Sequence, residues 1–404
     1  MSRPVWISAR RSLLALVLLG VIGSTGAVVA ADPVVTSEFV FAPRSDHNHA
    51  PSIVETASGD LICSWYRGSG ERKADDVAIY GSRLRAGEST WSEPFLMADR
   101  EGFPDCNTAM MIDASGKLWL FWPTIIANSW ESCITNFRVS SEYAADGCPV
   151  WEREGVILMK PDDFAAAAIE QLDILVARYQ SRLTPSLTAE IATVRERLSD
   201  KLFQRLGWQP RCKPTVLRDG RILLPLYTDT YSLSIMAISD DAGRTWRSGQ
   251  PTLGFGAIQP SVLERSDGEL VAYMRENGAT GKVRVSRSSD RGETWGPVEL
   301  TELPNPGSGL DALRLASGRW MIVYNDLPEG EDDRGQLAIA FSDDEGDSWT
   351  QVRHLEKRDS GAYHYPAAIQ GADGRIHVVY SYFAEGGKTM KHVAFNEDWL
   401  TSQK

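Results

Sequence analysis

The sequence predicts an all-β protein, a six-bladed β-propeller with a helical insertion between blades two and three. Three observations lead to this prediction: a strand–turn–strand unit occurs six times, an acidic turn motif follows several copies, and one segment departs from the pattern with helical periodicity. A repeat of this length indicates one sheet per copy. Radial stacking of such sheets buries the apolar faces that a single copy would leave exposed.

The repeated unit begins with a polar cluster, continues into an apolar strand, and turns at a glycine into a second apolar strand. Its clearest copy starts at Gln259, turns at Asp267–Gly268 and ends at Arg275. The six copies cover residues 47–66, 106–122, 211–227, 259–275, 308–324 and 363–380. Glycine provides the positive φ that a tight hairpin turn requires, so each copy is predicted to be a hairpin.

A second motif, Ser-x-Asp-x-Gly-x-(Ser/Thr)-Trp, follows three of the copies, at residues 239–246, 288–295 and 342–349. A weaker version lies at 86–91 and a stretched one at 140–151. The aspartate is expected to accept backbone N–H groups, the glycine to adopt the left-handed conformation, and the tryptophan to pack into the sheet. We therefore interpret this motif as structural and expect it at the periphery.

The last strand of the chain, at 391–396, is the third strand of blade six, and no fourth strand follows it. The apolar segment at 37–42 is expected to take that place and close the ring, which removes an exposed sheet edge.

Residues 161–208 depart from the repeat. Apolar residues recur there at spacings of three and four, and Pro185 separates two such runs. This pattern predicts a helical hairpin between blades two and three. The hairpin could be a lid or wall beside the central site, or an insertion that the fold tolerates, and we favour the second interpretation.

The first thirty residues resemble a secretory signal peptide. Arg10 and Arg11 precede the apolar run 12–23, and small residues follow up to a cleavage point near Ala30 or Ala31. The predicted domains are therefore 1–30, the signal peptide, and 31–404, the propeller with its insertion at 161–208. The apolar run is short for a stable transmembrane helix. The mature protein is expected to be secreted or periplasmic, and the alternative is a retained membrane anchor.

Composition narrows the possible partners. A net charge of −12 argues against nucleic acid, because phosphate binding requires a basic surface. No CxxC spacing occurs, and neither a metal nor another cofactor is expected. Cys133 and Cys148 flank one predicted hairpin and could form a disulfide after export, or all five cysteines could remain thiols.

Candidate functional residues lie at the starts of the inner strands, which converge on one rim of a propeller. Polar and ionisable residues gather there: His47, Asn48, His49, Asp105, Asn107, Arg211, Lys213, Gln259, Asp311, Tyr363, His364 and Tyr365. They could form a ligand site or a self-satisfied buried network. Arg275 and Arg334 lie close enough in sequence to reach the same rim, where an arginine fork suits a carboxylate.

These repeats and rim residues resemble the sialidase superfamily over roughly residues 37–399, apart from the insertion. The resemblance implies that Arg275 and Arg334 bind a substrate carboxylate, that Tyr365 is the nucleophile, and that Asp76, or else Asp75, is the acid/base. Two positions depart from the family pattern. His49 stands where the family has its first arginine, and Gln259 stands where the family has the glutamate that assists the tyrosine. The chain thus resembles a divergent, BNR-repeat branch.

Three functions follow as alternatives. The first is a sialidase-like glycoside hydrolase acting on acidic sugars of glycans, with Tyr365, Asp76 and His49 as catalytic candidates. Its expected substrate-binding residues are Arg275, Arg334, Lys213, Gln259, His47, His364 and Asp105. The second is a polysaccharide lyase, in which His49 or His364 and Tyr365 exchange protons with a uronic acid. The third is a non-catalytic glycan-binding propeller, which the missing glutamate and arginine favour.

Overall fold

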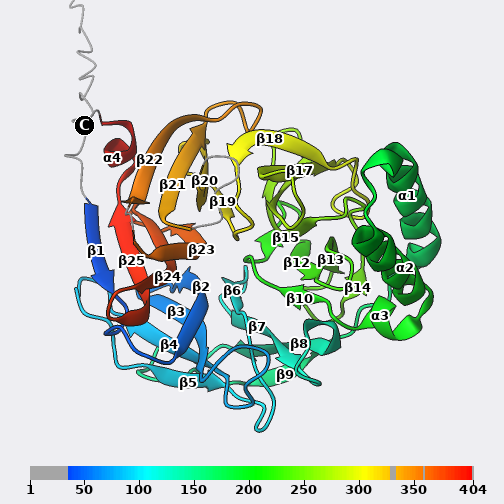
Figure 1. The fold of residues 1–404 in the computed structure, drawn as a ribbon. Coiled ribbons are helices and arrows are strands. Elements are labelled where there is room, and N and C mark those ends of the chain that lie inside the picture. Colours follow the sequence, from blue (N-terminus) through cyan, green and yellow to red (C-terminus); the bar gives the residue numbers. More distant parts are fainter. Residues whose placement is uncertain (1–34, 328–333, 358–359, 403–404) are drawn as a thin grey trace, which may run out of the picture. The chain divides into compact units, whose positions relative to one another are not determined.

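The computed structural model describes residues 35–327, 334–357 and 360–402 and arranges their strands in six antiparallel sheets. Figure 1 shows these sheets placed radially, as blades around a common centre. The predicted six-bladed propeller is confirmed. The predicted signal peptide, 1–30, lies outside the described residues.

Blades one to three follow one another along the chain. Blade one contains β2 (His47–Glu55), β3 (Leu61–Gly68), β4 (Ala78–Leu84) and β5 (Phe95–Ala98). Blade two contains β6 (Ala109–Ile112), β7 (Leu118–Ile125), β8 (Cys133–Ser140) and β9 (Arg153–Ile157), with a short 3₁₀ helix at Trp130–Ser132. Blade three contains β10 (Gln209–Pro210), β11 (Thr215–Val216), β12 (Ile222–Thr228), β13 (Leu233–Ser239) and β14 (Arg247–Ser248). Both β10 and β11 pair with β12, so the inner strand of this blade is interrupted at residues 211–214.

Blades four to six complete the circle. Blade four contains β15 (Ala257–Glu264), β16 (Leu270–Glu276), β17 (Lys282–Ser288) and β18 (Glu299–Pro304). Blade five contains β19 (Asp311–Arg314), β20 (Trp320–Asn325), β21 (Gln336–Ser342) and β22 (Thr350–Lys357). Blade six contains β23 (Ala362–Gln370), β24 (Ile376–Ala384), β25 (Gly387–Phe395) and β1 (Val35–Phe39). The short helix α4 (Glu397–Thr401) follows β25.

The ring closes through the two ends of the described chain. Strand β1 pairs antiparallel with β25, from Val35 opposite Phe395 to Phe39 opposite Lys391. The expected closing strand is confirmed, although it begins two residues before the predicted 37–42 segment and ends at Phe39. This pairing covers the edge that β25 would otherwise present to solvent.

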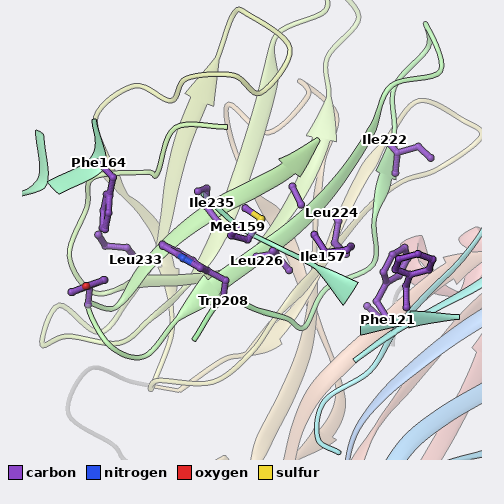
Figure 2. Packing of buried hydrophobic residues seen from close by; sticks show 14 of the residues in the cluster. Phe121, Ile157, Met159, Phe164, Trp208, Ile222, Leu224, Leu226, Leu233 and Ile235 are labelled. Carbon is purple, nitrogen blue, oxygen red and sulfur yellow. The ribbon is translucent and has the colours of Figure 1, made fainter. Parts of the chain in front are cut away.

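Hydrophobic side chains fill the spaces between neighbouring blades. Figure 2 shows one such cluster, which joins blade two, blade three and the helical insertion through Phe121, Ile157, Met159, Phe164, Trp208, Ile222, Leu224, Leu226, Leu233 and Ile235. Alternate residues of β12 point to opposite faces, so Leu223 packs instead with Val262 and Leu270 of blade four. Each fully buried leucine or isoleucine contributes about 1.5–3 kcal/mol of transfer free energy, which makes these inter-blade layers the core of the fold.

The acidic turn motifs have the structural role predicted for them. In the first, the Asp241 carboxylate accepts hydrogen bonds from Thr245 N (2.9 Å) and Thr245 Oγ1 (2.7 Å). These bonds lower the pKa of Asp241 to about 2. Asp290 and Asp344 accept the equivalent backbone bonds at 3.0 and 2.8 Å. The motif tryptophans pack against the inter-blade clusters.

Three inner strands share a backbone irregularity that matters for the site. In β2, β15 and β23 the register shifts at an X–Pro pair, and the residue before the proline has a positive φ: 53° at Ala50, 56° at Gln259 and 55° at Tyr365. Proline lacks the N–H that a regular ladder needs, and a left-handed residue before it costs about 1–3 kcal/mol. The three bulges thus re-aim the side chains at the starts of these strands.

The insertion is a helical hairpin, as predicted. Helices α1 (Phe164–Arg178) and α2 (Pro185–Ser199) are followed by the short α3 (Lys201–Arg205), and a 3₁₀ turn at Gln180–Arg182 links the first two. Pro185 begins α2, and Thr184 caps that helix by accepting a hydrogen bond from Leu187 N (3.2 Å). Figure 1 shows these helices at the outer edge, beside blade three. A groove of about 730 Å³ between α1 and blade four includes none of the predicted rim residues.

Two further sequence-based questions concern export. All five cysteines are free thiols, so Cys133 and Cys148 do not form a disulfide in this structure. Among the described residues, no helix has the length and apolar character needed to cross a bilayer.

Candidate functional site

The site is built around Tyr365, which projects from the bulge at the start of β23 and remains partly exposed. Its phenol oxygen accepts a 2.8 Å hydrogen bond from Arg275 Nη1 at the end of β16. Gly309, before β19, lies against the ring, and a Cβ added there would sit 2.3 Å from Tyr365 Cδ1. A residue without a side chain at 309 is therefore required for this ring position.

Three guanidinium groups surround the Tyr365 ring. The Cζ atoms of Arg211, Arg334 and Arg275 lie 4.9, 5.7 and 5.9 Å from the ring centroid. They come from blades three, five and four, so residues of different blades come together at one rim, as predicted. Within the described part of the chain none of the three forms an ion pair with a carboxylate. The three guanidinium charges make the surroundings of Tyr365 positive, and the nearby carboxylates of Glu71 and Asp229 offset part of this charge through Arg334 and Arg275.

Several polar atoms at this point are buried without a hydrogen-bond partner among the described residues: Arg211 Nε, Arg275 Nε, Gln259 Oε1 and His364 Nδ1. Buried polar groups in folded proteins are almost always satisfied, and each orphan costs about 1–3 kcal/mol. The described residues around Tyr365 therefore do not form a fully self-satisfied network, and a ligand site there stays a prediction.

The positive charges change the chemistry of the phenol. Burial raises the pKa of Tyr365, but Arg275 and Arg334, with a hydrogen bond from Gln259 and the charge of Arg211, outweigh it and leave the pKa below its ordinary value. The neighbouring phenol of Tyr227 behaves differently, because burial and the charge of Asp229 hold its pKa well above the usual range. The surroundings of Tyr365 thus favour its phenolate form, whereas those of Tyr227 favour the neutral phenol.

Gln259 lies beside Tyr365 at the bulge of β15 and is 1% exposed. Its Oε1 lies near Gly309, and its side chain lies beside Tyr227, whose hydroxyl accepts a 3.2 Å hydrogen bond from Asn107 Nδ2. The residue is therefore placed where a carboxylate would meet the phenol, but an amide cannot take up a proton from it.

The predicted histidines gather on the blade-one side of Tyr365. The His49 ring lies 4.4 Å from the Tyr365 ring and 4.7 Å from the His364 ring, centroid to centroid, and His49 Nδ1 shares a 2.7 Å hydrogen bond with Ser381 Oγ. Burial, followed by the charges of neighbouring histidines and arginines, holds the pKa of both His49 and His364 well below 6.5. Both rings are therefore neutral at pH 7. They lie against one side of Tyr365.

The ring of His47 lies 5.7 Å from that of His49, centroid to centroid, and also contacts the polar loop of blade one. Its Nε2 lies 3.4 Å from Glu71 Oε1, and Glu71 also accepts a 2.9 Å hydrogen bond from Tyr66 Oη. The bond to His47 lowers the pKa of Glu71 and keeps it ionised. Glu71 belongs to the same polar loop as the predicted acid/base but was not among the predicted residues.

Asp76 lies in the exposed part of that loop. Its carboxylate accepts hydrogen bonds from Ser69 N (3.0 Å) and Ser69 Oγ (2.8 Å) and has no contact with Tyr365 in this arrangement. The alternative residue, Asp75, accepts a 2.7 Å bond from Asn128 Nδ2. The structure therefore does not bring either aspartate against the phenol, and the acid/base role remains a prediction.

Two other predicted substrate-binding residues are engaged within the protein. Lys213 Nζ contacts Asp311 Oδ2 at 2.6 Å, and Asp311 also accepts a hydrogen bond from Ala368 N at 2.9 Å, so Asp311 connects blades three, five and six. Asp105 is fully buried and accepts hydrogen bonds from Trp122 Nε1 (2.9 Å), from Arg100 N (2.6 Å) and from Thr124. Burial raises the pKa of Asp105 to about 6. Their roles as ligand contacts stay predictions.

Sequence reasoning underestimated Arg211. It placed this residue on the rim but assigned it no part in anion binding, because no family motif marks the interrupted inner strand of blade three. Pro214 was a usable signal, since it breaks the ladder between β10 and β11 and frees the preceding residues from regular pairing. Among the described residues, no group of three or more histidine, cysteine, aspartate or glutamate side chains is arranged to hold a metal ion.

The six blades and the cluster of arginines around a partly exposed tyrosine define a class of β-propeller, and the comparisons identify the family. The model of the BNR repeat-like domain family matches residues 59–185 and 193–378, so the chain belongs to that family. It is a sialidase-like BNR-repeat protein.

Individual relatives agree with this assignment. The chain is 28% identical over 375 residues to the sialidase of Micromonospora viridifaciens, which covers 87% of this chain and 51% of that protein. It thus spans about half the length of that relative. Two solved structures share the fold with TM-scores of 0.66. One is a protein of unknown function from Dyadobacter fermentans (17% identity, 90% of this chain and 99% of the other), and one is a leech intramolecular trans-sialidase complexed with 2,7-anhydro-Neu5Ac (14%, 91% and 71%).

Proposed function

We propose that this protein is an exported, sialidase-like glycoside hydrolase acting on acidic, sialic-acid-like sugars of glycans. The observation that carries the proposal is the set of guanidinium groups around Tyr365, which have no carboxylate partner among the described residues. Arg275 and Arg334 are partly exposed, so a sugar carboxylate entering the pocket can pair with them. The sialidase relative supports a glycan as the substrate.

The proposed reaction has two steps. The phenol proton of Tyr365 passes to water, and the resulting phenolate oxygen forms a bond to the anomeric carbon while the bond from that carbon to the leaving oxygen breaks and Asp76 donates a proton to the leaving oxygen. Water then attacks the anomeric carbon, Asp76 takes back a proton, and Tyr365 is released. Asp76 has to turn from Ser69 toward the pocket for this role, which its exposed loop position permits.

One observation favours a second candidate, a glycan-binding propeller without turnover. Gln259 is not a base, and Asp76 is held by Ser69 rather than facing the phenol. Such a protein would still use the arginines to bind an acidic sugar.

A digestion screen separates these functions. The protein is incubated with α-linked sialosides and uronic-acid glycans, and the products are identified by mass and by near-ultraviolet absorbance, which marks an unsaturated lyase product. We expect release of a terminal acidic sugar, and we expect Tyr365→Phe to abolish it while binding persists. Binding in a glycan array without product would instead establish the second candidate. If the protein neither binds these glycans nor forms a product from them, both candidate functions are refuted.

A further inference from the structure

Arg211 differs from the other two arginines around Tyr365 in its backbone position and in its burial. It lies in the gap between β10 and β11, is 1% exposed, and places its Cζ 4.9 Å from the Tyr365 ring centroid. Its Nη2 donates a 2.9 Å hydrogen bond to the carbonyl of Pro366, the residue that completes the Tyr365 bulge. Arg211 therefore contacts both the face of the nucleophile and the strained backbone that carries it.

Its accessibility distinguishes it from a substrate-binding residue. Arg275 and Arg334 are partly exposed, and Arg275 meets the phenol oxygen directly. Arg211 is covered, so a ligand that enters from solvent meets Tyr365 and the outer arginines first. A buried cation over an aromatic face interacts favourably with the neutral ring and more strongly still with a phenolate, because the second interaction is between opposite charges in a medium of low dielectric.

No carboxylate among the described residues forms a hydrogen bond with Tyr365 Oη. Arg275 donates a hydrogen bond to Tyr365 Oη, and the other groups that lower the pKa of this phenol, Arg334 and Gln259, are not carboxylates either. His49 lies against the ring, but its Nδ1 is bonded to Ser381. If Tyr365 reacts as a nucleophile, its ionisation has to be supported by charge rather than by a paired base.

We propose that Arg211 is a positioning residue that holds Tyr365 in its bulge and stabilises its phenolate, so that fixed positive charge replaces the missing carboxylate base. This inference rests on the proposed function, in which Tyr365 is the nucleophile. The phenol proton passes to water at the pocket mouth before the sugar binds. The resulting phenolate oxygen then bonds to the anomeric carbon, the leaving oxygen departs with its bonding electrons, and Asp76 supplies the proton that this oxygen acquires.

The test measures phenol ionisation and turnover separately. Ultraviolet difference absorbance of tyrosinate is followed against pH in the wild type, Arg211→Met and Arg211→Lys, and subtraction of the same titration in Tyr365→Phe isolates Tyr365. Arg218→Met is the matched control, because it also removes one positive charge from blade three but at an exposed turn that contacts Arg265 and Ser266. Values of kcat and KM are measured across the same pH range with an aryl sialoside.

In Arg211→Met we expect the Tyr365 titration and the acidic limb of kcat to move upward by about one pH unit, and kcat at neutral pH to fall about tenfold or more with KM within about threefold. The sign follows because loss of a nearby cation destabilises the phenolate. Arg211→Lys should show a smaller shift in the same direction, since the charge is kept but the hydrogen bond from Nη2 to the Pro366 carbonyl is lost. Arg218→Met should match the wild type.

Three results would overturn the inference: an unmoved Tyr365 titration in both Arg211 variants, a loss confined to KM, or an equal shift in Arg218→Met. Thermal unfolding reports whether each variant folds. If Arg211→Met does not fold, the inference is judged on Arg211→Lys. Absence of wild-type turnover would refute the proposed hydrolase. The titration would still show whether Arg211 controls Tyr365, so the two failures are distinguishable.

Discussion

Arg275 Nη1 donates a 2.8 Å hydrogen bond to Tyr365 Oη and thereby joins the end of β16 in blade four to the start of β23 in blade six. The two residues are 90 positions apart in sequence, and they meet because the inner strands converge on one rim. The bond joins a charged donor to a phenol oxygen whose pKa lies below its ordinary value. It therefore links the anion-binding and nucleophilic parts of the pocket.

The first prediction concerns that bond. Arg275→Met should lower kcat/KM for an acidic glycoside about 10- to 100-fold, because a hydrogen bond from a charged group contributes about 1.5–3 kcal/mol. The measurement is steady-state kinetics at fixed pH and salt. Arg287→Met is the control, since Arg287 lies in the same blade but pairs with Glu269 and Asp347 at the outer edge. Equal kinetics in the wild type and a folded Arg275→Met would contradict the role.

The fold could be predicted from sequence because its signals are local. Hairpin turns, the acidic motif of Asp241 and the helical period of the insertion each depend on residues that are neighbours in the chain. The site could be predicted only in part. Arg275, Arg334 and Tyr365 come together as expected. The closeness of Arg211 to Tyr365 depends on how blades three and six face each other, which no local pattern encodes.

The same reasoning explains the uncertain acid/base. Whether Asp76 faces the pocket or bonds to Ser69 depends on loop conformation, and residue type does not determine it. Glu71 shows the opposite case. Nothing in the sequence of the loop distinguished it, yet the contacts of Tyr66 and His47 direct its carboxylate inward.

The second prediction concerns the departure at position 259. Gln259→Glu should raise kcat about tenfold, because the new carboxylate lies beside Tyr365 and can accept its proton. The guanidinium groups nearby would offset the cost of burying the added charge. Gln259→Leu, which matches the size but has no polar group, should not gain activity. A fall in kcat in the glutamate variant, with the fold intact, would show that charge stabilisation alone activates Tyr365.

The third prediction concerns Gly309. Gly309→Ala should displace the Tyr365 ring and lower kcat at least about tenfold, because the new Cβ would lie 2.3 Å from Tyr365 Cδ1. The unfolding free energy should fall by about 1–3 kcal/mol, as for other overpacked sites. Gly296→Ala is the matched control, since its added Cβ would make only an ordinary 3.5 Å contact with the Arg287 carbonyl. Denaturant unfolding and kinetics on both variants check this. Wild-type kinetics in Gly309→Ala would mean that the ring position is not critical.

The fourth prediction concerns pH. Burial holds the pKa of His49 and His364 well below 6.5 in the folded protein, so the unfolded chain binds more protons below that value and stability falls as pH decreases from 6.5. Each histidine contributes a slope of up to about 1.4 kcal/mol per pH unit. Asp105 and Asp229 act in the opposite direction, because burial raises the pKa of each to about 6 and protonation then favours the folded state.

The contribution of the histidines therefore has to be measured as a difference. Urea unfolding of the wild type is compared with that of the double variant His49→Gln/His364→Gln from pH 7.5 to 5. Both proteins contain the same carboxyl groups, so the contributions of Asp105 and Asp229 cancel in the difference. The double variant should lose less stability as pH falls, because glutamine takes up no proton in the unfolded chain. Parallel curves would show that the two rings take up protons over the same pH range in the folded protein as in the unfolded chain. Below about pH 6.5 the histidines beside Tyr365 would then be charged, and a sugar carboxylate would meet two further cations.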